Sequence, residues 1–175
     1  CDRIRFLKTD NAGEYSSEEF KAFCKEKGIK KLFTSAYMHE ENGIAEVIFR
    51  EAAAVARAML LTADLPLELW PLAYSHSFWL RARMPHIDND MQIPQRLIFP
   101  NEELSLSDVH VFGCNAYQWL DPDQRYNQQP DRSRHLHNRA RPLIYVGHDD
   151  YSKSWLLFDL DSQQLVYSGR PRFIE

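Results

Sequence analysis

Apolar and polar positions in the first third of the chain predict strands and helices in turn. Residues 4–9 have the composition of a strand, and residues 16–28 combine an N-capping serine, early acids and a final glycine, which is typical of a short helix. Residues 29–35 are predicted as a second strand. Apolar side chains then recur at helical spacing through residues 44–63. Strand, helix, strand and helix in this order predict an α/β fold.

The pattern changes twice further along the chain. A third helix is expected to begin near Pro66, to bend or restart at Pro71, and to end at Pro85. Residues 86–108 are polar, contain proline and lack periodicity beyond a short apolar run, so they are predicted as a connector. Short β-type runs separated by turn residues follow, and they predict a small antiparallel sheet or barrel. These runs are residues 109–120, 142–147, 154–160, 164–169 and 171–175.

Length and composition narrow the organisation. A chain of 175 residues with 44% hydrophobic content can bury one good core, or a modest core and a small second one. We therefore predict an α/β domain over residues 1–85, a connector over 86–108 and a β domain over 109–175. No run approaches about 18 apolar residues, so no membrane association is expected. Three scattered cysteines favour a reducing, intracellular compartment.

The charge of the chain is slightly negative overall but strongly positive in one segment. A net charge of -4 means that any binding to nucleic acid phosphates must be local. Residues 125–141 contain five arginines and one aspartate, and we take Arg132, Arg134, Arg139 and Arg141 as candidate phosphate contacts. The alternative is a solvated insertion with no such role.

Two acids attract attention because of their places in the predicted elements. Asp10 closes the first predicted strand, where a simple turn would also account for it. Glu46 begins the long helix and shares a stripe with Arg50 and Arg57, away from the apolar face. The alternative for Glu46 is an ion pair with Arg50, worth a few tenths of a kcal/mol. Between the two acids lie 35 residues, numbers 11–45.

A series of motifs extends this observation over nearly the whole chain. In order, they are TDNAGEY, AYMHEENGIAEV, ARAML, DLP, LW, VFGCNAY, YVGHDDYSKSWLLFD and PRFIE. With the 35-residue spacing, this series resembles the integrase of copia-type (Pseudoviridae) LTR retrotransposons, within the Pol polyprotein. The part that it resembles is the C-terminal portion of the catalytic core and the domain that follows it.

The resemblance implies a fold and a chemistry. The implied fold is a partial ribonuclease H-like α/β domain, lacking its first strands, followed by a small SH3-like β domain. Asp10 and Glu46 would be the second and third acids of a DDE triad that holds Mg²⁺ or Mn²⁺ in the intact parent. The parent would trim the element's DNA ends and join them to target DNA, as a homo-oligomer in the nucleus. Arg50 and Arg57 would then contact DNA.

The chain also departs from the family pattern. The first acid of the triad lies well upstream of the second, and only nine residues precede Asp10 here, so we expect this chain to lack that acid and to be inactive. Because the chain starts at Cys1 with a strand-like run, we also expect it to be a piece of a longer product. Val47 stands where the family has arginine, and Glu40 and Glu41 replace two glutamines. These changes also fit a decayed or repurposed copy that binds nucleic acid or protein. A different ribonuclease H-like nuclease is a third possibility, disfavoured by VFGCNAY and the β-type tail.

Overall fold

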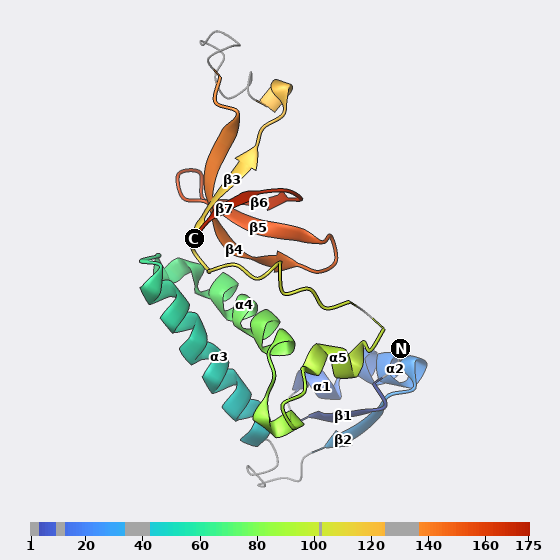
Figure 1. Cartoon of the computed structure of the whole chain (residues 1–175). Coiled ribbons are helices and arrows are strands. Elements are labelled where there is room, and N and C mark those ends of the chain that lie inside the picture. The colour runs from blue at the N-terminus through green and yellow to red at the C-terminus, as the bar shows by residue number, and fades with distance from the viewer. Residues whose placement is uncertain (1–3, 10–12, 34–42, 102, 125–136) are drawn as a thin grey trace.

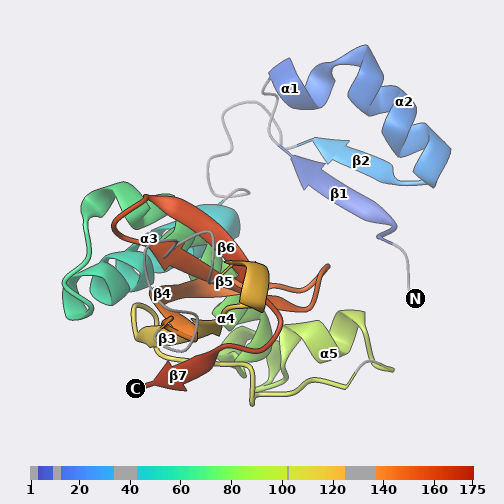
Figure 2. The same cartoon turned by 90° about the horizontal axis from the view of Figure 1, so that it is seen from above.

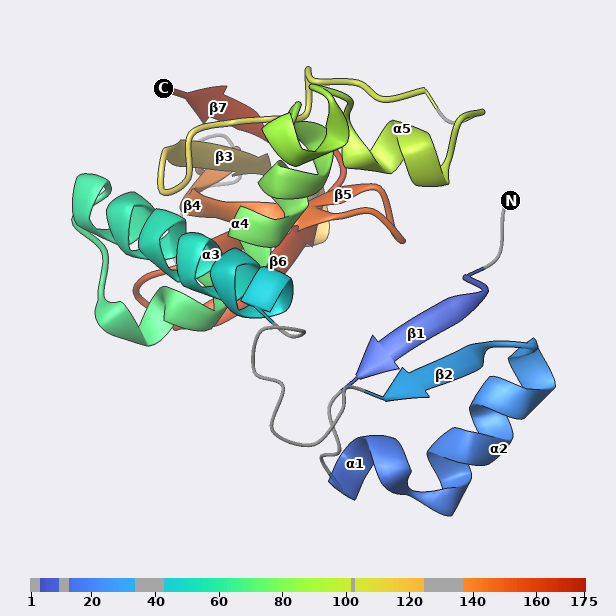
Figure 3. The same cartoon turned by 90° about the horizontal axis from the view of Figure 1, so that it is seen from below.

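A computed structural model describes residues 4–9, 13–33, 43–101, 103–124 and 137–175, and its first elements form a small α/β unit (Figure 1). Strands β1 (Phe6–Thr9) and β2 (Lys30–Phe33) pair in parallel. Between them run α1 (Gly13–Ser16) and α2 (Glu18–Lys27). Figures 2 and 3 show this unit apart from the later sheet.

Local sequence explains the ends of α2. The Ser17 hydroxyl accepts a hydrogen bond from the Phe20 amide at 3.2 Å, which satisfies one of the free donors at the helix start. At the other end Gly28 adopts a left-handed conformation with φ of 69°, and its amide donates back to the Lys25 carbonyl. The predicted helix and both predicted strands of this unit are confirmed, with slightly shorter bounds.

Two long helices pack side by side after this unit. Helix α3 (Gly43–Thr62) confirms the predicted helix, and α4 (Trp70–Arg83) follows a 3-10 turn at Leu67–Leu69. Pro71 lies in the first turn of α4, where its missing amide hydrogen costs nothing, so it starts this helix and does not bend it. No helix in the described ranges is long and apolar enough to cross a membrane.

The C-terminal part is a five-stranded antiparallel sheet in the order β6, β5, β4, β3, β7. Its strands are β3 (Asn115–Trp119), β4 (Ala140–Asp149), β5 (Ser154–Asp159), β6 (Gln164–Ser168) and β7 (Arg172–Ile174). The register of β4 against β5 shifts between Tyr145 and Gly147, which marks a bulge. The predicted α/β part followed by an antiparallel β part is therefore present.

One hydrophobic cluster joins the helices to the sheet. Ala56 and Leu60 of α3 and Ala73 of α4 pack in one buried cluster with Ile144 and Val146 of β4. The opposite face of the sheet holds a second cluster, made of Ala116, Leu143, Tyr145 and Leu157. Helices that the sequence assigned to residues 1–85 thus share a core with the sheet of residues 109–175, and the domain division stays a prediction.

The structure differs from the sequence-based expectation at three places. The run at 109–120 is strand only from Asn115, because Gly113 turns the chain with φ of 82° and donates its amide to the Tyr145 carbonyl at 2.7 Å. The connector contains a short helix, α5 (Pro94–Ile98), begun by a proline. Helix α1 starts at Gly13, where the sequence indicated only a turn.

Candidate functional site

The predicted acidic site is described at one of its two members. Glu46 lies in the first turn of α3 with an exposed side chain, and Arg50 and Arg57 are exposed further along this helix. No ion pair joins Glu46 to Arg50 among the described residues, so the simple pairing alternative is not realised there. An acid in the first turn is in any case favoured by the positive end of the helix dipole.

The other predicted site residues divide into two groups. Asp10, Arg132 and Arg134 lie outside the described residues, and their roles stay predictions. Arg139 is exposed beside the start of β4. Arg141 on β4 is different, because its guanidinium is half-buried and donates to the carboxylate of Asp159 and to the Ser162 hydroxyl. A structural pairing therefore accounts for Arg141 in part, and its phosphate role stays a prediction.

The described residues contain no group of three or more His, Cys, Asp or Glu side chains placed to hold a metal ion. The predicted pair of Asp10 and Glu46 is not tested by that finding, because Asp10 falls outside the ranges searched.

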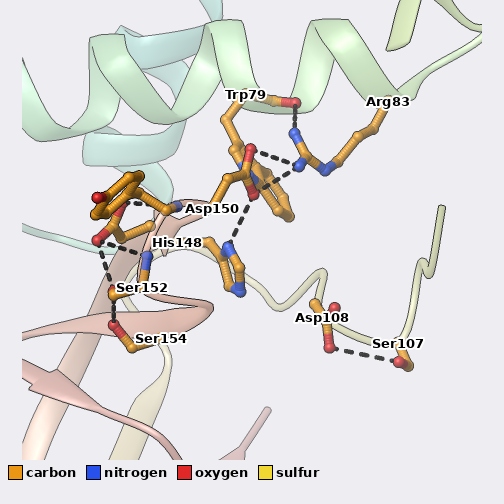
Figure 4. Close-up of polar contacts among 10 residues, drawn as sticks. Trp79, Arg83, Ser107, Asp108, His148, Asp150, Ser152 and Ser154 are labelled. Atoms are coloured by element: carbon orange, nitrogen blue, oxygen red, sulfur yellow. Dashed lines mark hydrogen bonds and ion pairs between the residues drawn. The ribbon is translucent and has the colours of Figure 1, made fainter. Parts of the chain in front are cut away.

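A connected polar cluster that sequence reasoning missed joins α4 to the β4–β5 hairpin (Figure 4). The guanidinium of Arg83, only 7% exposed, donates to both carboxylate oxygens of Asp150 at 2.7 Å. The Trp79 indole N–H donates to the same carboxylate at 2.9 Å. Arg83 also lies 3.9 Å from the centre of the Trp79 ring, and His148 Nδ1 is 3.1 Å from Asp150. The cluster fixes the helix on the sheet.

The ionisation of this cluster follows from its contacts. Partial burial opposes the charge on Asp150, but the hydrogen bonds from Trp79 and Arg83 and the positive charge of Arg83 outweigh it, so the pKa of Asp150 is lowered. Arg83 therefore faces an ionised partner at neutral pH. An aromatic ring, a cation and a carboxylate held in this way form a structural joint, in which Arg83 is buried and the Asp150 carboxylate is 55% exposed.

His76 lies beneath the same cluster and is 2% exposed. Its ring stacks on Trp79 at 5.3 Å and meets Phe112 and Tyr145 at 5.6 and 5.4 Å. Neither ring nitrogen has a hydrogen-bond partner among the described atoms. Burial, together with the charges of His148 and Arg83, lowers the pKa of His76 to about 4, so this histidine is neutral at pH 7.

Comparison with known proteins identifies relatives of the whole chain. No family model matches it. The Retrovirus-related Pol polyprotein from transposon TNT 1-94 of Nicotiana tabacum is 31% identical over 173 residues, which is 99% of this chain. The chain is similar over nearly its whole length to a retrotransposon Pol polyprotein. Those from transposons RE1 and RE2 of Arabidopsis thaliana are 27% and 26% identical, again over 99% of the chain.

These three relatives confirm the predicted kinship with copia-type Pol polyproteins. The chain spans only 11 to 12% of the length of each relative, so it matches one region of each of these polyproteins. This similarity therefore does not by itself assign the activities of a whole polyprotein to the chain, and any such activity is a proposal.

One solved structure is also similar. It is a chain of the simian T-cell lymphotropic virus intasome in complex with PP2A regulatory subunit B56 gamma. The TM-score is 0.45 and the identity 14%, over 94% of this chain and 55% of that chain. Similarity at this level supports no conclusion about the fold or the activity of the retrotransposon-related chain.

Proposed function

We propose that the chain is a fragment of the integrase region of a copia-type retrotransposon Pol polyprotein, and that the intact parent processes and joins DNA. The kinship over 99% of the chain carries this proposal, because it spans both acids of the 35-residue pair. In this proposal the α/β part is a partial ribonuclease H-like domain and the five-stranded sheet is an SH3-like domain.

Asp10 and Glu46 are proposed as two of the three carboxylates that hold Mg²⁺ or Mn²⁺ in the parent. The donor set fits, because these hard cations prefer oxygen ligands, and Glu46 offers an exposed carboxylate with no ion pair among the described residues. When bound, such ions would activate the attacking oxygen and stabilise the leaving one. In the sequence Asp10 directly follows Thr9, the last residue of β1.

The chain by itself is proposed to be inactive. A site that holds two divalent cations needs several fixed negative charges, and only two of the triad's carboxylates belong to this chain. Its partners would be the element's DNA ends and target DNA, the parent would act as a homo-oligomer, and its place of action would be the nucleus.

The arginines of α3 are proposed to contact DNA phosphates beside Glu46. Arg50 and Arg57 lie one and three turns beyond Glu46 on the same stripe, and both are exposed. A guanidinium suits this role because it donates several hydrogen bonds in the geometry that phosphate accepts. Arg132, Arg134 and Arg139 are proposed as further contacts.

DNA binding by the purified chain tests this proposal. The dissociation constant for a labelled duplex of about 20 base pairs is measured from 50 to 300 mM salt. Each phosphate contact contributes a slope of about 0.9 to the dependence of log Kd on log salt. We expect the double variant Arg50→Ala/Arg57→Ala to bind more weakly with a slope lower by about two, while the control Arg96→Ala keeps the wild-type slope. Salt-independent binding, or no binding, would contradict a DNA role.

A second function is favoured by one observation next to Glu46. Val47 is 38% exposed at the position where the family has arginine, so this place cannot neutralise a phosphate. A repurposed, non-catalytic copy that binds nucleic acid or protein would tolerate this change. Restoring the charge with Val47→Arg should strengthen duplex binding if the DNA surface is intact, and should leave it unchanged in a copy that binds only protein.

A further inference from the structure

Aromatic and arginine side chains gather at one end of the sheet face that also packs on α3 and α4. Along β3, Ala116 is fully buried, whereas its neighbours on the other face, Tyr117 and Trp119, are 36% and 58% exposed. Arg170 and Arg172, just before and within β7, are also exposed. We call these four residues, together with exposed Tyr167 of β6, the aromatic–arginine face.

The strand register sets the order of this face. Tyr117 of β3 lies directly opposite Arg172 of β7 in the antiparallel pairing. Directly opposite residues share a face and lie about 5 Å apart at their Cβ atoms. Trp119, two residues after Tyr117, and Arg170, two residues before Arg172, line the same open cavity of about 320 Å³, which Tyr167 also lines. Each ring on β3 therefore has an arginine as its neighbour.

Helices α3 and α4 cover another part of this same sheet face. Ile144 and Val146 of β4 lie in the cluster with α3 and α4, and Leu156 of β5 packs against it. In Figure 1 the end of β3 that carries Trp119 points away from both helices. The aromatic–arginine face thus lies beside the part of the sheet that the helices cover, and its rings on β3 are 36% and 58% exposed.

The charge of the face favours an anionic partner. Arg170 and Arg172 make no hydrogen bond or ion pair with another residue in the part of the chain that the structure describes. Asp121 also lines the cavity, so the local balance is two positive charges against one negative charge. Exposed rings that alternate with unengaged guanidiniums match the bases and phosphates of a nucleic acid.

We propose that the aromatic–arginine face binds single-stranded nucleic acid, stacking bases on Trp119 and its neighbouring tyrosines while Arg170 and Arg172 contact phosphates. Tyr117 and Trp119 are about 7 Å apart along β3, so each ring takes its own base. A duplex keeps its bases stacked on one another and cannot offer their faces to these rings. The choice of nucleic acid over protein rests on the proposed function, but neither Asp10, Glu46 nor a metal ion is required.

Fluorescence anisotropy with a labelled oligothymidylate of about 15 nucleotides tests the proposal on the whole 175-residue chain. We expect Trp119→Ala to weaken binding by about 5-fold to 150-fold, the range found for loss of one base-stacking ring. Trp119→Phe should recover much of the affinity, because it keeps a ring. Arg170→Ala should lower the slope of log Kd against log salt by about 0.7, the value for one phosphate contact on a single strand.

Matched controls separate this face from general effects. Trp70→Ala removes a tryptophan that is 55% exposed at the start of α4, and Arg96→Ala removes an exposed arginine on α5, so neither should change binding. Far-UV circular dichroism confirms that each variant is folded.

The possible results have distinct meanings. Selective loss of single-strand binding in Trp119→Ala and Arg170→Ala supports the proposal. Single-strand binding that neither variant weakens overturns it, as does a wild-type chain that binds only duplex. In both cases the proposed DNA function would stand. A wild-type chain that binds neither single strand nor duplex would overturn both.

Discussion

Replacing His76 by phenylalanine tests the packing of α4 on the sheet through its dependence on pH. His76 is buried with a pKa near 4, against 6.5 for the ordinary side chain. Between these values the unfolded chain takes up a proton that the folded chain does not. Stability therefore falls as the pH is lowered from 6.5 towards 4, and it rises again with increasing pH.

The size of this effect follows from the pKa difference. One pKa unit corresponds to about 1.4 kcal/mol, so the full change between pH 6.5 and 4 is about 3 kcal/mol. That is a large part of the stability of a small domain. The groups around the ring do not reverse the sign, because Arg83 and His148 both disfavour a charge on His76. Asp150 and Glu175, whose pKa values are lowered, lose their contributions only below about pH 4.5.

The assay is urea unfolding followed by far-UV circular dichroism at several pH values from 7 to 4.5. His76→Phe keeps a ring against Trp79 and removes two buried nitrogens that lack partners, so we expect equal or higher stability at pH 7 and little acid loss down to pH 4.5. The control His110→Phe removes an imidazole that has a partner, Glu175, and should retain the acid loss. An equal acid loss of stability in His76→Phe and in the wild type would show that His76 is not its source.

Three further predictions concern the same part of the molecule. Asp150→Ala leaves Arg83 buried without its partner, and urea unfolding should show a loss of about 1–3 kcal/mol, whereas an unchanged midpoint would mean that the cluster is not a joint. Gly113→Ala would place its Cβ 2.4 Å from the Cβ of Ala63 at a positive φ, so the melting temperature should drop by several degrees, and an unchanged value would contradict the turn. Burial raises the pKa of the Cys114 thiol to about 11, so iodoacetamide at pH 8 should modify it much more slowly in the native chain than in urea, and equal rates would contradict its burial.

Local signals account for the elements that were predicted correctly. Ser17 and Gly28 mark the ends of α2 because capping depends on residues within one turn of the helix. Apolar spacing gave α3 because its buried face repeats with the helical period. The error at residues 109–114 has a local cause as well, since apolar composition predicted a strand where the positive φ of Gly113 turns the chain.

The polar contacts around Asp150 and the burial of His76 could not be predicted from the sequence, for physical reasons. Glu46 could be placed on a helix start, but the joint of Arg83 with Asp150 spans 67 residues and arises only through packing. Burial of His76 was equally hidden, because a histidine on an amphipathic helix is compatible with either face. The motif YVGHDDYSKSWLLFD was the one sequence signal at Asp150, and it carried no indication of the partner helix.

The central claim is that Asp10 and Glu46 belong to the active site of a DNA-joining parent. A strand-transfer assay with labelled element ends and Mg²⁺ or Mn²⁺ tests it most directly, using the 175-residue chain beside a polypeptide extended upstream of Cys1. We expect metal-dependent joining by the extended polypeptide, its loss in Asp10→Asn and in Glu46→Gln, and no joining by the shorter chain. Joining that survives both replacements, or joining by the 175-residue chain that Asp10→Asn abolishes, would contradict it.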